Sequence, residues 1–199
     1  RRQHHRCGHQ PASVGGGPAG LAAAGLTPVV CIYSSFLQRG FDQIVHDVCL
    51  QNLHVVFAID RAGLVGADGE THQGIFDVSF LTCIPNMTLL APKNAKELKS
   101  ALKFAIDFDG PVAVRYPRGI AYDSLNEFES KIEFGKGEML FEESDIALFA
   151  IGSMVSTAKN LREKLKSRGF NVSVANARFF KPIDFELVDK LCKNHKLIV

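Results

Sequence analysis

Hydrophobic and polar residues alternate along the first half of the chain in blocks that predict strands and helices in turn. Phe41, Ile44, Val45 and Val48 repeat with the spacing of one helix face. Asn94, followed by Glu97, predicts a helix start that runs to about residue 108. Short apolar runs bounded by turn residues predict buried strands, and they occur at residues 27–32, 53–59, 87–91 and 112–116. Strands separated by helices indicate an α/β fold, a parallel sheet with helices on both faces.

The second half resumes the same alternation after a stretch without sustained periodicity. Residues 123–143 carry scattered charge and isolated glycines, so we expect a linker that contains a short strand or two. The predicted strands and helices after it are 145–151, 157–167, 172–175, 184–193 and the strand start at 196–199. We therefore expect one α/β domain at 21–122 and part of a second at 144–199. The pattern is cut off at the last residue, which predicts that the chain is a piece of a longer protein.

The first twenty residues differ from the rest in composition and periodicity. They are rich in Arg, His and Gln and then in Gly, Pro and Ala, with no apolar period. We expect this segment to be disordered. His4, His5, Cys7 and His9 could chelate a metal, but their spacing does not match a closed zinc site, and no metal site is predicted.

Composition narrows the classes of function. The net charge is +2 without a long basic run, so no nucleic-acid partner is expected. No apolar run approaches the roughly 20 residues that span a bilayer, so no membrane association is expected. The five cysteines are odd in number and widely spaced, which favours reduced thiols over a disulfide framework.

Polar and aromatic side chains follow the predicted strands directly. Tyr33, Asp60 and Arg61, together with the residues after Tyr116, should converge on one edge of the sheet, where open parallel sheets bind ligands. Phe36 flanks the turn after the first strand. Its ring either packs in the core at the helix start or forms an aromatic wall against a planar ring.

Three arginines are candidates for binding an oxyanion or a phosphate, because guanidinium offers a bidentate fork. They are Arg39, Arg61 and Arg118. A lone surface arginine is usually only solvated, but Arg61 and Arg118 follow different strands, which favours a functional role. Arg115 lies inside a strand, and we expect it to be structural.

Asp68 and His72 lie four residues apart in a glycine-rich loop. A histidine can shuttle protons near neutral pH. A lone loop histidine is more often a surface residue, and the neighbouring Asp68, Thr71 and Gln73 strengthen the functional interpretation without settling it.

Taken together, four loop motifs resemble those of the 1-deoxy-D-xylulose-5-phosphate synthases, a thiamine-diphosphate-dependent family with a transketolase-like fold. The motifs are YSSFLQR at 33–39, IDRAG at 59–63, GADGETHQG at 66–74 and RYPRG at 115–119. The resemblance covers residues 21 to 199. It implies most of a transketolase pyrimidine-binding domain followed by the first part of a transketolase C-terminal domain.

The resemblance also implies a reaction and its setting. Pyruvate would condense with D-glyceraldehyde 3-phosphate to give 1-deoxy-D-xylulose 5-phosphate and CO2. The 1-deoxy-D-xylulose 5-phosphate would be a precursor of isoprenoids, thiamine and pyridoxal. The cofactors would be thiamine diphosphate and Mg²⁺, the Mg²⁺ ligands being expected in an N-terminal domain outside this chain. The complete protein would be a homodimer in the cytoplasm, or in a plastid-type organelle of a eukaryote.

Carried over by motif position, the resemblance implies a role for each candidate residue. Phe36 would pack against the aminopyrimidine ring of the cofactor, with Arg39 nearby. Asp68 and His72 would line the substrate side and manage protons. The phosphate of the acceptor would be held by Tyr33, Arg61 and Arg118.

The amino-terminal segment departs from the family pattern. The family carries a glutamate that contacts the aminopyrimidine, and its equivalent place falls within residues 10–14, yet no glutamate precedes Glu70. We therefore expect the chain alone to be inactive. Two alternatives stay open: another ketol-transferring or decarboxylating enzyme of this fold, and a non-catalytic domain that acts only in subunit association.

Overall fold

The computed structural model describes residues 6–7 and 14–199, which form two compact units. The first unit comprises the residues up to Leu90 together with Ala101–Ile120. The second comprises Ala91–Ser100 together with Ala121–Val199. The candidate metal ligands His4, His5 and His9, the side chain of Cys7, and residues 10–13, where a family glutamate would be expected, lie outside the described part.

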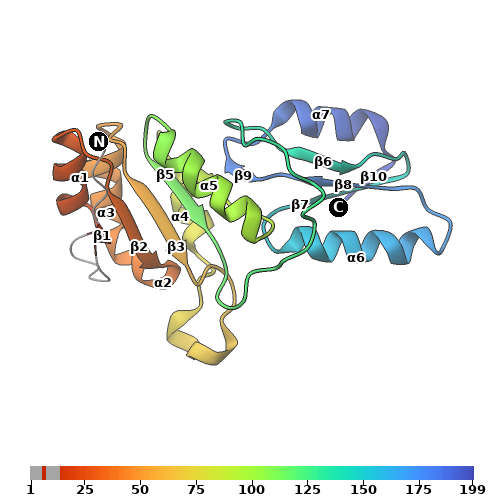
Figure 1. Ribbon diagram of the computed structural model, residues 1–199, viewed down its shortest axis with the longest axis horizontal. Helices are drawn as coiled ribbons and strands as arrows, with labels where there is room; N and C mark the ends of the chain where they lie inside the picture. The colour runs from red at the N-terminus through yellow and green to blue at the C-terminus, as the bar shows by residue number, and fades with distance from the viewer. Residues whose placement is uncertain (1–5, 8–13) are drawn as a thin grey trace. The chain divides into compact units, whose positions relative to one another are not determined.

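The first unit is built on a parallel sheet (Figure 1). Its strands, in spatial order, are β1 (Arg6–Cys7), β2 (Val29–Tyr33), β3 (Val56–Asp60), β5 (Val112–Arg115) and β4 (Thr88–Leu90). Residues 55–59 are fully or almost fully buried, as expected for a central strand covered on both faces. The parallel sheet predicted from the sequence is therefore confirmed.

Helices cover both faces of this sheet, with α5 in front and α4 behind in Figure 1. The predicted helix after β2 is built from consecutive short segments, in which Ile44 and Val48 are fully buried while Phe41 is 39% exposed. The helical segments of the unit are α1 (Gly16–Ala23), α2 (Ser34–Leu37), η2 (Gln38–Gly40), α3 (Phe41–Gln43), the π-helical η3 (Ile44–Cys49), α4 (Asp77–Cys83) and the part of α5 (Ala95–Asp107) that begins at Ala101. The first residues of α5 belong to the second unit.

Helix α1 begins inside the segment that we expect to be disordered. Pro18 and Ala19 are buried, so packing supplies the order that local sequence does not indicate. Gly15 packs so closely on Gln43 that a β-carbon there would lie 2.1 Å from the Gln43 β-carbon. The prediction of disorder through residue 20 is wrong for the helical residues 16–20.

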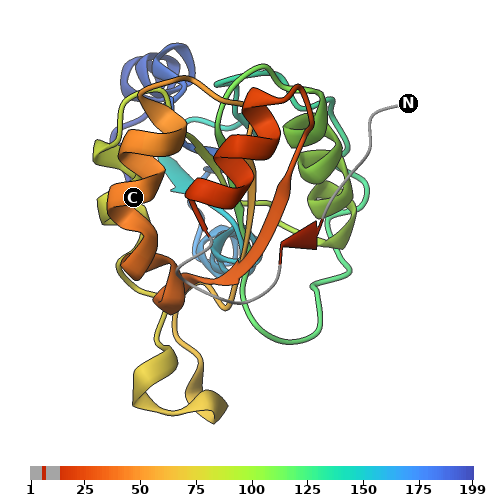
Figure 2. The ribbon, with the colours of Figure 1, turned by 90° about the vertical axis from the view of Figure 1, so that its left-hand side faces the viewer.

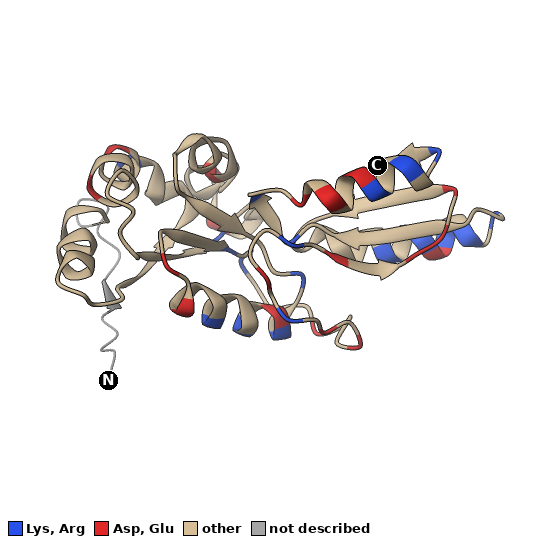
Figure 3. Ribbon diagram, turned by 90° about the horizontal axis from the view of Figure 1, so that it is seen from above, with Lys and Arg blue, Asp and Glu red and all other residues tan. Residues whose placement is uncertain are grey.

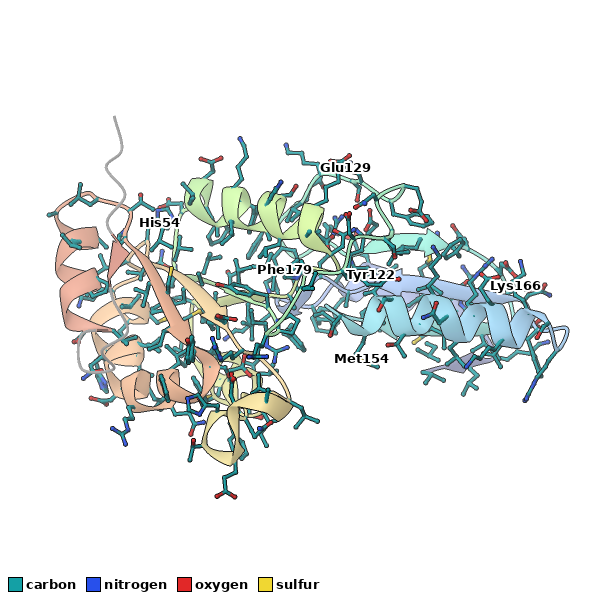
Figure 4. The ribbon with its side chains drawn as sticks, turned by 60° about the horizontal axis from the view of Figure 1, so that its bottom comes forward. His54, Tyr122, Glu129, Met154, Lys166 and Phe179 are labelled. Carbon is teal, nitrogen blue, oxygen red and sulfur yellow. The ribbon has the colours of Figure 1, made fainter. Side chains whose placement is uncertain are left out.

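Helix α5 begins where its capping residue predicts. The Asn94 side-chain oxygen accepts a hydrogen bond from the Glu97 backbone N–H at 2.8 Å, which satisfies one of the free donors of the first turn. Farther along the helix, the His54 Nε2 donates to the Ala105 carbonyl oxygen at 2.9 Å, and His54 is labelled in Figure 4.

The second unit holds a mixed sheet in the order β10 (Leu197–Ile198), β7 (Ile146–Ala150), β8 (Val172–Asn176) and β6 (Glu138–Phe141). Strands β10, β7 and β8 are parallel, whereas β6 runs antiparallel to β8. Strand β9 (Phe179–Lys181), which the sequence analysis missed, also belongs to this unit. The predicted alternation after residue 145 is thus confirmed, with an antiparallel strand supplied by the predicted linker.

Two helices cover opposite faces of the second sheet. Helix α6 (Met154–Lys166) packs on one face with Leu148, Val172 and Val174, and helix α7 (Phe185–Asn194) packs on the other with Ala147 and Ala175. Side chains alternate between the faces of a strand, so neighbouring residues of β7 and β8 serve different helices. Both helices carry basic and acidic residues, which Figure 3 shows in blue and red.

The described cysteines Cys31, Cys49, Cys83 and Cys192 are not joined in disulfides. In the described part of the chain, no helix combines the length and apolar character needed to cross a membrane.

Candidate functional site

The carboxyl ends of β2, β3 and β5 bring the predicted site residues of the first unit together. Tyr33 and Asp60 are the last residues of their strands and stand opposite each other in the register. Arg61 follows Asp60 directly, and Arg118 comes three residues after the end of β5. The predicted convergence on one sheet edge is therefore confirmed.

A loop from Gly63 to Gly74 projects from this edge, drawn in yellow in Figure 2. Its two ends are joined by a reciprocal pair of hydrogen bonds, Gly63 N–H to the Gly74 oxygen at 2.7 Å and Gly74 N–H to the Gly63 oxygen at 2.8 Å. A β-carbon at position 74 would lie 2.2 Å from the Arg61 carbonyl oxygen and 2.7 Å from the Ser34 β-carbon. Only glycine fits where the loop returns to the sheet.

Gln73 holds the interior of the loop. Its side-chain oxygen accepts from the Val65 N–H at 2.9 Å, and its amide nitrogen donates to the Gly69 carbonyl oxygen at 2.8 Å. These bonds give the loop a defined backbone although it has no regular secondary structure beyond two single turns, η4 (Gly66–Asp68) and η5 (Glu70–His72).

Asp68 lies between the two arginines that the sequence singles out for a phosphate. Its Oδ2 accepts from the Arg61 Nε at 2.5 Å, and its Oδ1 lies 3.0 Å from the Arg118 Nε. The hydrogen bond from Arg61 and the charge of Arg118 hold the pKa of Asp68 below its usual range, although burial opposes the shift. In this structure the two guanidinium groups share one carboxylate.

Arg61 is held from three sides. Its backbone N–H donates to the Asp60 Oδ1 at 2.6 Å, and its φ of +55° lies in the left-handed region. The guanidinium carbon lies 3.8 Å from the centroid of the Tyr33 ring, a cation–π contact. The hydrogen bond to Asp68 raises the pKa of Arg61 further, so its charge is permanent. The position of Asp60 after a predicted strand does not by itself indicate this role.

Three rings form an aromatic cluster beside the charged group. Tyr33 and Phe36 stack with centroids 5.4 Å apart, and His72 meets Phe36 edge-on at 5.2 Å. The His72 Nδ1 also lies 3.0 Å from the Thr71 hydroxyl oxygen. The structure thus joins Phe36, the loop histidine and Tyr33, as the motifs suggest. The sequence indicates this contact of Thr71 only in a general way, because polar neighbours in a loop often orient a histidine.

Arg39 stands apart from the other six candidates. It lies in η2 and is exposed, and among the described residues it makes none of the contacts that join the rest. Arg115, expected to be structural, ends β5 and pairs with the buried Asp77, which the sequence analysis did not single out.

The residues present suit a planar heterocycle with polar substituents. Tyr33, Phe36 and His72 offer ring faces and edges. The buried hydroxyl oxygens of Ser34 and Ser35, in the turn after β2, have no hydrogen-bond partner among the described residues. Within residues 6–7 and 14–199, no group of three or more His, Cys, Asp or Glu side chains could hold a metal ion.

Comparison with known proteins identifies two transketolase domains in the chain. Residues 12–122 match the transketolase pyrimidine-binding domain, and residues 135–199 match the transketolase C-terminal domain.

Curated relatives carry the name that the loop motifs suggest. The chain is 55% identical over 181 residues to the 1-deoxy-D-xylulose-5-phosphate synthase of Lachnoclostridium phytofermentans and 50% identical over 181 residues to that of Clostridium tetani. These alignments cover 91% of this chain but only 29% of each relative, so the chain spans less than a third of their length. The resemblance to these synthases is confirmed.

Solved structures show the same fold. A split-gene transketolase described as an inactive β4 tetramer superposes with a TM-score of 0.84 at 28% identity, over 92% of this chain and 59% of that one. A transketolase of Pichia stipitis, solved with fructose 6-phosphate, superposes with a TM-score of 0.73 at 24% identity, over 81% of this chain and 24% of that one.

Proposed function

The chain belongs to the transketolase family, with a pyrimidine-binding domain followed by C-terminal domain sequence, and on this premise we propose that it is part of a 1-deoxy-D-xylulose-5-phosphate synthase. The complete protein would condense pyruvate with D-glyceraldehyde 3-phosphate, releasing CO2. One observation carries the proposal: Arg61, Arg118 and Tyr33 meet Asp68 and His72 at a single sheet edge.

The two arginines suit the phosphate of the acceptor. Each carries a permanent charge and a planar fork, which matches phosphate oxygens better than a lysine does. Both are already oriented by Asp68, at 2.5 Å from Arg61 and 3.0 Å from Arg118. A phosphate that replaces the carboxylate would find its two donors in place, which lowers the ordering cost of binding.

His72 is placed to hold or move a proton at its Nε2. The Nδ1 faces the Thr71 hydroxyl at 3.0 Å, and a hydroxyl that donates there leaves the proton of the neutral ring on Nε2. The Phe36 and Tyr33 rings restrict the imidazole, and Asp68 places a negative charge in the same loop. These contacts favour His72 as the proton-handling group and Asp68 as the organiser of the arginines.

Thiamine diphosphate, when bound, supplies the stabilised carbanion that this chemistry needs. Phe36 is the residue of this chain that would pack against its planar ring. Arg39 follows Phe36 by three residues and is exposed. It forms no ion pair with the described residues, so it could face the polar groups of the cofactor. Any Mg²⁺ would require ligands beyond those described.

A second candidate function is subunit association without catalysis. The solved split-gene transketolase, which matches 92% of this chain with 59% of its own, is described as an inactive tetramer. A protein of the same fold can thus assemble without turnover. The absence of a glutamate before Glu70 also favours this candidate.

A chimera separates the two candidates. The 181 aligned residues of the Lachnoclostridium relative would be replaced by those of this chain, and product would be measured from pyruvate and D-glyceraldehyde 3-phosphate. We expect turnover within about tenfold of the parent, because the site residues come from this chain and the remaining domains from the relative. The matched control is the same chimera carrying His72→Ala and Arg61→Ala, which should lose activity.

A folded chimera that binds thiamine diphosphate but makes no product would contradict the synthase proposal. Association of the isolated chain, measured by sedimentation, together with an inactive chimera would support the non-catalytic candidate instead. The isolated chain itself should show no synthase activity, and any product formed by it would overturn that expectation.

A further inference from the structure

We infer that Asp77 and Arg115 form a positioning pair that sets the place of the loop carrying Asp68 and His72, an inference that rests on the proposed function. Asp77 is the first residue of α4, and its side chain is 0% exposed. Arg115 is the last residue of β5. The Arg115 Nε donates to the Asp77 Oδ2 at 2.7 Å, and the Nη2 donates to the Oδ1 at 3.3 Å.

Stability alone does not explain a pair of this kind. Removing two charges from water costs about as much as their attraction returns, and well-packed apolar residues often serve as well. A two-point contact between a planar guanidinium and a carboxylate does fix direction as well as distance. The pair therefore provides a geometric constraint between the end of β5 and the start of α4.

The constraint acts on the loop because Asp77 holds the loop's returning end, in addition to the hydrogen bonds between Gly63 and Gly74. The chain leaves the sheet after β3 at Gly63 and returns at Gly74, three residues before Asp77. Ile75 and Phe76, which connect Gly74 to Asp77, are 50% and 56% exposed and so provide little packing of their own. Asp77 is thus the first buried side chain after the loop that could hold its returning end.

The other end of the constraint is tied to the same site. Arg115 stands opposite Ile59 in the register of β3, and the Tyr116 N–H donates to the Ile59 oxygen at 3.0 Å. Arg118 follows on the same strand exit and meets Asp68. The Asp77–Arg115 pair and the Asp68–Arg118 pair therefore link the loop to the exit of β5 at two points.

The first test needs no activity. In the complete polypeptide that contains this chain, amide hydrogen exchange would be followed in residues 63–76 for the parent, Arg115→Lys and Asp77→Asn. Both variants keep a polar partner, so the fold should survive while the two-point geometry is lost. We expect exchange in residues 63–76 to be about tenfold faster or more, with little change in β2 and β3.

The matched control is Arg162→Lys in the second unit. Arg162 is also a mostly buried arginine that pairs with a carboxylate, Glu143, at 2.5 Å. A merely structural role would make the two arginine variants alike: both would lower the melting temperature and neither would selectively loosen residues 63–76. Unchanged exchange in this loop in Arg115→Lys and Asp77→Asn would overturn the inference.

The second test uses turnover per folded molecule. We expect kcat to fall about tenfold to a hundredfold in Arg115→Lys, because small displacements of reacting groups cost this much. The KM for the phosphorylated acceptor should change less, because Arg61 emerges directly from β3. Arg162→Lys should leave both constants unchanged.

The two tests separate failure of the inference from failure of the proposed function. A parent without synthase activity whose loop still loosens in Arg115→Lys would overturn the function and support the pair. An active parent whose Arg115→Lys variant keeps kcat and loop protection would support the function and overturn the pair.

Discussion

The guanidinium carbon of Arg61 lies 3.8 Å from the centroid of the Tyr33 ring, so the residues that end β2 and follow β3 are joined across the edge of the sheet. Tyr33 and Asp60 are direct neighbours in the register, which is why Arg61 can reach the ring. The contact orients the guanidinium of Arg61, and the carboxylate of Asp68 pairs with both Arg61 and Arg118. An anion that binds at this edge meets a preformed cationic pair.

Arg61→Ala and Arg118→Ala should weaken use of a phosphorylated acceptor. Each variant removes a charge-assisted contact, and we expect the acceptor KM to rise at least about tenfold in the complete enzyme. Kinetics with D-glyceraldehyde 3-phosphate and with unphosphorylated glyceraldehyde would measure the effect.

The matched control is Arg168→Ala, which removes an exposed arginine of the second unit and should change neither KM. An acceptor KM that stays the same in both site variants would refute phosphate binding. It would favour another ketol-transferring or decarboxylating enzyme of this fold.

Asp68 should make a pH-dependent contribution to stability. Its pKa in the folded protein is lowered, first by the hydrogen bond from Arg61, so the charged form favours folding. The contribution is complete above the ordinary carboxyl value of about 4 and is lost as the pH falls through the lower folded value. The gap in melting temperature between the parent and Asp68→Asn should therefore be constant near neutral pH and should close in acid.

The control for this titration is Asp107→Asn, which changes a carboxylate that is 64% exposed and 3.9 Å from Lys103. Its melting temperature should stay close to that of the parent. A gap for Asp68→Asn that persists unchanged to about pH 2 would show that the carboxylate charge is not what stabilises the loop.

Gly74→Ala should disturb the base of the loop. The new β-carbon would lie 2.2 Å from the Arg61 carbonyl oxygen, so backbone must move, at a cost of about 1–3 kcal/mol. Gly66→Ala, in the same loop, places its β-carbon where no atom lies within 4 Å and should change stability by less than about 0.5 kcal/mol. Urea unfolding of both variants would compare them, and equal midpoints would contradict the packing argument.

Glu97→Ala should strongly destabilise the second unit. Its carboxylate, 5% exposed, accepts from Lys93 at 3.1 Å and from Arg178 at 2.7 Å, and the same two cations also contact Glu138. Burial raises the pKa of Glu138, but Lys93, Ser130 and Arg178 outweigh it, so the net shift is downward. Removing one member of this buried group leaves cations uncompensated, at a cost of about 3–5 kcal/mol.

Lys103→Ala is the comparison for the buried group, because its ion pair with Asp107 lies on the surface of α5. Its loss should cost less than about 1 kcal/mol. Chemical denaturation should show the contrast, and a small effect for Glu97→Ala would mean that the buried charges are not coupled.

The spacing of apolar residues and the capping residues predict most of the elements, because both are properties of short segments of sequence. The strands β2, β3, β4 and β5 lie within or beside the predicted apolar runs, and Asn94 caps α5 as its position before Glu97 indicates. Local pattern does not predict helix α1, because its glycines show no apolar period and packing orders the segment. Helix α4 and strand β9 are too short to show a clear period.

The sequence by itself determined the residue types of the site and the strand ends that carry them, because parallel strands present their carboxyl ends at one edge. Only the tertiary structure decided which partners they take. Asp68 reaches Arg118 across 50 residues of sequence. Arg115 finds Asp77 38 residues away, and Glu97, a helix-start residue by pattern, binds Arg178 81 residues later. Such pairings depend on how strands and loops are brought together in space, and no local period records them.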